Sequence, residues 1–297
     1  MKFEGTYTAL VTPFRAQDES IDWKAFDALI EAQIEGGIAG LVPCGTTGES
    51  PALTEDEHLA LVKRSVERAK GRVPVIAGTG SNSTKHAVHL SQAAEGAGAN
   101  AVMVVVPYYN KPTQEGLYRH YVTVAKSVKC PVMIYNIPGR TGIDLAADTL
   151  ARICDAAPNV LATKEATGNV LRAQELVRRM GSRLTVLCGD DALTLAMVAV
   201  GARGVVSVTS NVFPRAVANA TRAALAYDMP LAQKLHHALV PVHEAMFIEA
   251  NPGPAKAAMA ARGLLENVVR GPLCPMEEAS KKKLAAVLEE YARRSEA

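Results

Sequence analysis

Eight short apolar or β-branched segments recur along the chain, and this repetition restricts the possible folds more than any other feature. Each segment is followed by turn residues and then by a longer stretch with helical spacing of its apolar residues, which is typical of repeated βα units. The segments start roughly 20 to 35 residues apart, enough for a strand, a crossover helix and two loops. The predicted strands are 7–13, 40–45, 73–80, 100–107, 131–138, 160–167, 184–190 and 204–211.

Eight βα units joined by right-handed crossovers favour a (β/α)8 TIM barrel, an α/β fold, although periodicity alone leaves a doubly wound open sheet as an alternative. Thr54 and Glu57 form a predicted capping box at the start of a helix over 54–70. After about Asp228 no further strand is predicted, and 230–248, 254–265 and 276–294 are predicted helices. We therefore expect a catalytic barrel over 1–228 and a C-terminal helical domain over 229–297.

Charge and cysteine content exclude several classes of partner. The 32 basic and 30 acidic residues give a net charge of +2, and no long basic run is present, so we expect no nucleic-acid binding. The five cysteines form no Cys-x-x-Cys pair, which favours reduced thiols in a cytoplasmic protein over disulfides or a thiolate zinc site. The N-terminus lacks the apolar core of a secretory peptide, and all apolar runs are shorter than the about 20 residues of a membrane helix, so we expect a soluble protein.

A TIM barrel carries its active site at the C-terminal ends of its strands, and Lys164 ends the sixth predicted strand. Apolar residues 160–162 lead directly to it, so the barrel would carry this lysine into the mouth of the site. Burial disfavours an ammonium ion, and a neutral amine can attack a carbonyl carbon. A lysine that reaches solvent, or pairs with Glu165, is the structural alternative.

Two other strand ends carry three groups that suit a small carboxylate substrate. Tyr135 ends the neighbouring fifth strand and can exchange protons with an adduct on Lys164, or it can simply pack at the rim. The turn from Gly45 to Gly48 can present the amides of Thr46 and Thr47 to a carboxylate, although many such turns have no function. Arg140, on a proline-containing loop, can bind a carboxylate through two hydrogen bonds, or it is an ordinary surface arginine.

No metal and no cofactor are expected. His86 with His89, and His236, His237 and His243, lie at helical spacing, and we interpret both groups as solvated helix faces. Asp190 and Asp191 follow Gly189 and are expected to cap the next helix rather than to bind magnesium.

Five further segments occur in a characteristic order and spacing, namely 45–49 (GTTGE), 107–112 (PYYNKP), 135–142 (YNIPGRTG), 164–168 (KEATG) and 189–191 (GDD). Together they resemble the dihydrodipicolinate synthase family of the class I pyruvate-aldolase barrels, and the resemblance spans nearly the whole chain. It implies that Lys164 forms an imine with pyruvate, whose enamine attacks the aldehyde of L-aspartate 4-semialdehyde to give 4-hydroxy-tetrahydrodipicolinate, an intermediate of diaminopimelate and lysine biosynthesis. It also implies a homotetramer built from tight dimers.

The same resemblance implies a role for each residue of the site. Tyr135 would be the acid and base, and Thr47 would link it by hydrogen bonds to Tyr109, which would reach into a neighbouring subunit's site. Thr46 and Thr47 would hold the pyruvate carboxylate, and Arg140 the carboxylate of the semialdehyde. Backbone groups of Gly189 and Val206 would line the site.

Inhibited members of this family bind lysine at a dimer interface, and here the sequence departs from their pattern. Pro51, Glu55 and His86 replace an alanine, a histidine and a lysine-binding glutamate. Loss of that carboxylate removes a charge-assisted hydrogen bond worth about 1.5 to 3 kcal/mol, so we expect weak inhibition by lysine. Four other residues match the effector site, namely Ser50, His58, Asn82 and Tyr108.

Three other functions are known alternatives for a barrel of this fold. A related pyruvate-dependent aldolase, of the N-acetylneuraminate lyase or 2-keto-3-deoxygluconate aldolase type, would use the same lysine and tyrosine. A sugar-phosphate isomerase would need a glycine-rich phosphate site after the last strands, and residues 208–214 do not provide one. A barrel that has lost catalysis and senses a ligand has the same fold, and the joint presence of Lys164, Tyr135 and Thr47 argues against it.

Overall fold

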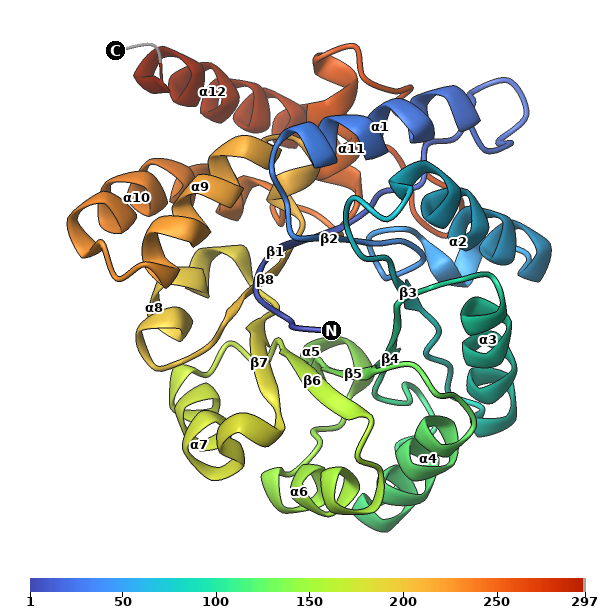
Figure 1. Ribbon diagram of the computed structural model, residues 1–297. Helices are drawn as coiled ribbons and strands as arrows, with labels where there is room; N and C mark the ends of the chain where they lie inside the picture. The colour runs from blue at the N-terminus through green and yellow to red at the C-terminus, as the bar shows by residue number, and fades with distance from the viewer. Residues whose placement is uncertain (296–297) are drawn as a thin grey trace.

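The computed structural model describes residues 1–295, and the last two residues of the predicted C-terminal domain lie outside this range. Eight parallel strands follow one another around a barrel, in the order β2-β1-β8-β7-β6-β5-β4-β3 (Figure 1). Seven of the eight predicted segments contain one strand, and β1 begins two residues before the segment predicted for it. The strands are β1 (Gly5–Ala9), β2 (Gly40–Val42), β3 (Ile76–Gly78), β4 (Ala101–Val105), β5 (Val132–Asn136), β6 (Val160–Glu165), β7 (Thr185–Cys188) and β8 (Gly204–Ser207).

Hydrogen bonds between β2 and β3 close the barrel. Leu41 forms a parallel bridge with Val75, the Leu41 amide donates to the Pro74 carbonyl at 2.9 Å, and the Gly78 amide donates to the Pro43 carbonyl at 2.9 Å. An open doubly wound sheet would leave two unpaired edges, so the predicted barrel is confirmed.

Helices form an outer ring around the strands, as expected when each parallel strand is followed by a crossover. The second helix of the chain begins with the predicted capping box. The Thr54 hydroxyl accepts from the Glu57 amide at 3.2 Å, and the Glu57 carboxylate accepts from the Thr54 amide at 2.9 Å. The ring consists of α1 (Trp23–Glu35), α2 (Glu55–Ala69), α3 (Thr84–Gly96), α4 (Gln114–Lys126), α6 (Ala147–Ala156), α7 (Val170–Met180), α8 (Thr194–Ala199) and α9 (Pro214–Leu225). The short α5 (Pro138–Thr141) follows β5 directly and lies inside the ring (Figure 1).

Two apolar cores hold these layers together. The larger one lies between the strands and the surrounding helices and includes Leu41, Val104 and Ile134. The smaller one fills the inside of the barrel, where Met103, Met133, Leu187 and Val206 pack together with Tyr135. A filled interior leaves room for a ligand only at the end of the barrel.

Three further helices follow the barrel, close to their predicted ranges: α10 (Met229–Ala245), α11 (Gly253–Ala261) and α12 (Glu278–Ser295). Figure 1 shows them gathered on one side of the ring, where α10 packs against α9 and α12. Three residues separate α9 from α10, and the division at residue 228 stays a prediction. Within residues 1–295 no helix is both long and apolar enough to cross a membrane.

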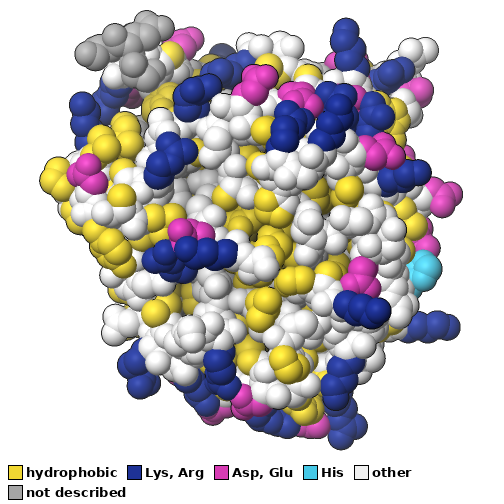
Figure 2. Space-filling view, in the orientation of Figure 1, with side chains coloured by type: hydrophobic (Ala, Val, Ile, Leu, Met, Phe, Trp, Pro, Cys, Tyr) yellow, Lys and Arg dark blue, Asp and Glu magenta, His cyan; other side chains and the backbone are white. Residues whose placement is uncertain are grey.

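The molecular surface in this orientation carries its charge at the periphery. Figure 2 shows Lys, Arg, Asp and Glu side chains mostly around the outer edge of this face, with apolar side chains visible nearer its centre. Positive and negative groups are interspersed, which agrees with the balanced charge of the sequence.

Candidate active site

Lys164 and Tyr135 lie side by side on neighbouring strands. They are Cα partners in the β5–β6 register, and their exposed fractions are 5% and 4%. The Lys164 Nζ lies 4.1 Å from the centroid of the Tyr135 ring. Among residues 1–295, no carboxylate lies within ion-pair distance of Lys164. An amine buried beside a phenol and free of an anionic partner can react with a carbonyl group.

Glu165, the neighbour that could have paired with Lys164, faces the other way. Its carboxylate accepts from the Arg172 Nε at 2.9 Å and from the Thr167 amide at 2.9 Å. Arg172 also contacts Asp144 at 3.3 Å, so this group joins β6, α7 and the segment after α5. Sequence analysis missed Arg172, because its distance of seven positions from Glu165 crosses a turn and has no fixed geometry. The Lys164–Glu165 pair considered above does not form.

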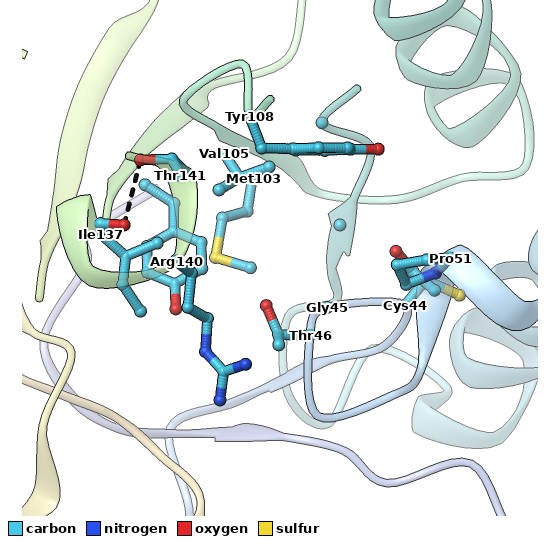
Figure 3. A pocket seen from close by; sticks show the side chains of 14 residues that line it. Cys44, Gly45, Thr46, Pro51, Met103, Val105, Tyr108, Ile137, Arg140 and Thr141 are labelled. Atoms are coloured by element: carbon cyan, nitrogen blue, oxygen red, sulfur yellow. Dashed lines mark hydrogen bonds between the residues drawn. The ribbon is translucent and has the colours of Figure 1, made fainter. Parts of the chain in front are cut away.

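A cavity of about 200 Å³ opens at the C-terminal ends of β2 to β5. Figure 3 shows Arg140 extending from α5 toward Thr46, with Tyr108 on another wall. The predicted loop that carries Arg140 is a single helical turn, whose Thr141 hydroxyl donates to the Ile137 carbonyl at 3.1 Å. Lys164 is not a lining residue and adjoins the cavity through Tyr135. The lining consists of Cys44, Gly45, Thr46, Ser50, Pro51, Gly78, Gly80, Met103, Val105, Tyr108, Tyr135, Ile137, Arg140 and Thr141.

The turn after β2 is held in an unusual backbone conformation. Cys44 and Glu49 have φ angles of 58° and 56°, and non-glycine residues in this region often mark functional sites. Gly78 on β3 allows the approach, because an added Cβ there would overlap the Cys44 carbonyl. The amides of Thr46 and Thr47 have no hydrogen-bond partner within residues 1–295, so they can bind a carboxylate.

Thr47 itself makes a contact that sequence analysis did not anticipate. It is 3% exposed, and its hydroxyl accepts from the Nδ2 of Asn251 at 3.0 Å. Within residues 1–295 it has no hydrogen bond to Tyr135 or Tyr109. Tyr109 points away from the chain, with an exposed fraction of 88% and a φ angle of 72°.

The loops after β7 and β8 place the remaining predicted residues. The Gly189 amide donates to the Glu165 carbonyl at 2.8 Å, and Val206 lies in the barrel interior with Tyr135. Asp190 caps a short helix, as predicted, by accepting from the Ala192 amide at 3.1 Å. Asp191 instead accepts from the amides of Val208 and Thr209 and thereby ties the two loops together.

The residues expected at an effector site fall into two groups. Ser50 and Tyr108 line the cavity just described, together with Pro51. Glu55 lies further out and contacts His89 at 2.6 Å and His86 at 4.0 Å.

The two further effector-site positions are His58 and Asn82. His58 is buried, and burial lowers its pKa below the ordinary value. The carbonyl of Asn82 accepts from the Nδ2 of Asn110 at 2.8 Å.

The interpretation of five histidines as solvated was wrong for two of them. His86 and His89 are exposed on α3, but His236 and His243 on α10 are 9% and 3% exposed. His243 Nδ1 lies 2.9 Å from the Thr209 hydroxyl, and His236 Nε2 lies 3.1 Å from the Ala192 carbonyl. These histidines occupy the face of α10 that packs on the barrel, and hydrogen bonds compensate their burial.

A thiol nucleophile is a poor alternative to Lys164 in this cavity. Burial raises the pKa of Cys44 far above its ordinary value, and it does the same for Cys188. Both thiols therefore stay protonated at neutral pH, and a protonated thiol is a weak nucleophile.

Comparisons with known proteins agree with this geometry. Residues 2–291 match the model of the dihydrodipicolinate synthetase family. A 4-hydroxy-tetrahydrodipicolinate synthase of Sorangium cellulosum is 57% identical over 297 residues, covering 100% of this chain and 99% of that protein. The crystal structure of dihydrodipicolinate synthase from Aquifex aeolicus is 46% identical with a TM-score of 0.96, covering 98% of each chain. The chloride-inhibited enzyme of Acinetobacter baumannii, complexed with pyruvate, is 40% identical with a TM-score of 0.96, covering 98% of this chain and 99% of that one.

Proposed function

This chain belongs to the dihydrodipicolinate synthetase family, and we propose that it condenses pyruvate with L-aspartate 4-semialdehyde to form 4-hydroxy-tetrahydrodipicolinate and water. The observation that carries the proposal is the burial of Lys164 beside Tyr135, with no carboxylate partner within residues 1–295. Relatives that span the whole chain and are named for this synthase activity give further support.

The reaction begins at the Lys164 Nζ. In its neutral form it attacks the C2 carbonyl of pyruvate, and Tyr135 protonates the hydroxyl that leaves as water, which gives the imine. Loss of a C3 proton forms an enamine, whose C3 attacks the aldehyde carbon of the semialdehyde. The amine of the semialdehyde then attacks C2, closes the ring and releases Lys164. No step requires a metal or an organic cofactor.

Three groups around the cavity bind the substrates in this scheme. The free amides of Thr46 and Thr47 bind the pyruvate carboxylate, and the Arg140 guanidinium binds the carboxylate of the semialdehyde. We assign to Thr47 the transfer of protons between Tyr135 and Tyr109. Within residues 1–295 Thr47 has no hydrogen bond to either tyrosine, so this relay needs the Tyr109 that a second subunit would insert. Backbone groups of Gly189 and Val206 line the site.

Tyr109 supports a homo-oligomeric enzyme. An aromatic ring that is 88% exposed on a loop beside the cavity suits insertion into the site of a second subunit. The family resemblance implies the form of this oligomer, a homotetramer built from tight dimers. Its five free cysteines support a reducing, cytoplasmic location.

The proposed function is tested by supplying pyruvate with a panel of aldehydes and measuring pyruvate consumption. We expect the semialdehyde to be consumed fastest. Faster consumption with N-acetylmannosamine or glyceraldehyde would assign the chain to the related lyases and aldolases, and no turnover with any aldehyde would support a ligand-sensing protein. Arg140→Ala should raise the KM for the semialdehyde about 10- to 150-fold, the effect of losing a charge-assisted hydrogen bond. Arg119→Ala on α4, 77% exposed at its side chain, is the control and should not.

Weak inhibition by lysine remains a prediction. The carboxylate of Glu55 could substitute for the missing glutamate, but it contacts His89 and lies close to His86. An effector ammonium would therefore have to compete with His89 for this carboxylate. We expect activity at saturating pyruvate to fall little as L-lysine is added. Half-inhibition below about 1 mM, which corresponds to roughly 4 kcal/mol of binding, would contradict this expectation.

A further inference from the structure

Asn251 connects the C-terminal helices to the active site. It lies in the segment between α10 and α11, is 6% exposed, and donates from Nδ2 to the Thr47 hydroxyl at 3.0 Å. The two residues are 204 positions apart in the sequence. The C-terminal extension therefore contacts the turn that carries the amides of Thr46 and Thr47.

A second contact fixes the other end of the same turn. The carboxylate of Glu49 forms an ion pair with Lys256 of α11, and the side chains are 1% and 0% exposed. Glu49 also accepts from the Arg270 amide at 2.9 Å, and Lys256 donates to the Val268 carbonyl at 2.7 Å. Since both charges are buried and hydrogen-bonded, the pair has little freedom to move.

The contact with Asn251 restricts where the Thr47 proton can point. A threonine hydroxyl has one hydrogen and two acceptor lone pairs. The amide of Asn251 occupies one lone pair, so the hydroxyl hydrogen must be directed elsewhere. The Asn251 Oδ1 has no hydrogen-bond partner within residues 1–295, so it does not accept this hydrogen.

We propose that Asn251 is a positioning residue, which keeps the Thr47 hydroxyl oriented as a proton donor toward the reacting groups, while the Glu49–Lys256 pair fixes the turn that carries it. This proposal rests on the function proposed above, because it assigns Thr47 to the proton relay. It makes the C-terminal helices part of the catalytic apparatus, although none of their residues is among those that line the cavity.

A double-mutant cycle between Asn251 and Thr47 tests the proposal. Asn251→Ala should lower kcat about 5- to 10-fold, the effect of losing one hydrogen bond, and leave the pyruvate KM within about 2-fold. In a Thr47→Val background the same substitution should lower kcat less than about 2-fold, because the hydroxyl is already absent. Borohydride trapping of pyruvate on Lys164 should persist in all these variants.

Asn251→Asp reverses the polarity of the hydrogen bond at nearly constant volume. A carboxylate only accepts, so it would draw the Thr47 hydrogen to itself, and kcat should fall further than in Asn251→Ala. If Asn251→Ala fails to fold, the cycle is run with Asn251→Asp, with folding checked by circular dichroism. A variant such as Arg270→Lys cannot replace Asn251→Asp in the cycle, because Arg270 contacts Glu49 and not Thr47.

Two results would overturn the inference. Equal losses of kcat with and without the Thr47 hydroxyl would show that Asn251 acts only on the general structure. Wild-type kcat in Asn251→Asp would show that the direction of this hydrogen bond has no role. Failure of the proposed function is distinguishable, because the unmodified protein would then show no turnover of pyruvate with the semialdehyde.

Discussion

Lys164 and Lys256 are the two buried lysines of residues 1–295, and their surroundings differ in one decisive respect. Each Nζ lies over an aromatic ring, Lys164 at 4.1 Å from the Tyr135 centroid and Lys256 at 4.2 Å from the Phe14 centroid. Lys256 is also paired with Glu49, whereas Lys164 has no anionic partner among the described residues. The amine of Lys256 therefore stabilises the structure, and the amine of Lys164 remains available for covalent chemistry.

The difference follows from the positions of the two residues in the fold. Lys164 ends a barrel strand, where side chains converge on the cavity, and its neighbour Glu165 is bound to Arg172. Lys256 lies on α11 between the extension and the barrel, where a buried charge must be neutralised. Burial alone therefore does not identify a catalytic lysine, and the partner must be considered too.

The largest expected effect comes from removing the unpaired amine. Lys164→Arg should lower turnover by at least about 10⁴-fold, because a guanidinium stays protonated and cannot form the imine. Borohydride added with pyruvate should inactivate the unmodified enzyme and label the peptide that contains Lys164, as mass spectrometry would show. A label on Lys256 would reverse the roles of the two lysines.

The next largest effect is expected from the hydroxyl group of Tyr135, the tyrosine beside Lys164. Tyr135→Phe keeps the ring under Lys164 but removes the hydroxyl, so kcat should fall about 10²- to 10⁴-fold with a smaller change in pyruvate KM. Tyr121→Phe is the control, because within residues 1–295 the only hydrogen bond of this buried hydroxyl is the one it donates to the Val104 carbonyl at 3.4 Å. Steady-state kinetics should show normal kcat in the control. If Tyr135→Phe is also normal, Tyr135 is not the acid and base.

The barrel and the strand-end residues were predictable from the sequence because they depend on local patterns. An apolar run followed by a polar residue marks both a strand and its end, which is how Lys164 and Tyr135 were found. The capping box of Thr54 and Glu57 needs only four consecutive residues. The range predicted for the helix α10 was also close to the observed one. Only the predicted exposure of His236 and His243 was wrong, because helical spacing does not reveal which face of a helix is buried.

The contacts of the C-terminal extension could not be predicted in this way. Glu49 and Lys256 are 207 positions apart, and Thr47 and Asn251 are 204 apart. Such contacts depend on how α10 and α11 dock on the barrel, and no local pattern encodes that arrangement. The short helix that carries Arg140 was also missed, because four residues are too few for a periodic signal.

Stability should respond in opposite directions at the two lysines. Lys256→Met should lower the free energy of unfolding by about 3 to 5 kcal/mol, because Glu49 is left buried without its partner. Adding Glu49→Gln should recover part of this loss. Lys164→Met should be neutral or stabilising by about 1 kcal/mol, since no partner is abandoned. Urea unfolding gives the free energy of unfolding of the unmodified protein and of the three variants. Equal losses of stability in Lys256→Met and Lys164→Met would contradict the proposed difference between the two lysines.

The smallest expected effect is a pH dependence of stability that arises from Lys256. Burial lowers the pKa of Lys256 to about 8, from 10.5 in its ordinary state, although Glu49 acts in the opposite direction. Between these two values the unfolded chain binds a proton that the folded chain does not, so the free energy of unfolding rises with pH in this window. The contribution of Lys256 is complete above pH 10.5 and lost as the pH falls through 8, a total of about 3 kcal/mol at about 1.4 kcal/mol per unit.

The reference for this measurement is the double variant Glu49→Gln with Lys256→Met, in which neither member of the pair titrates. Urea unfolding of both proteins between pH 7 and pH 10.5 gives the difference in free energy, from which the titration of all other groups cancels. We expect the free energy of unfolding of the unmodified protein to rise relative to that of the reference as the pH rises. A constant difference would mean that Glu49 fully offsets the burial of Lys256, and a decreasing one would mean that its attraction prevails and raises the pKa.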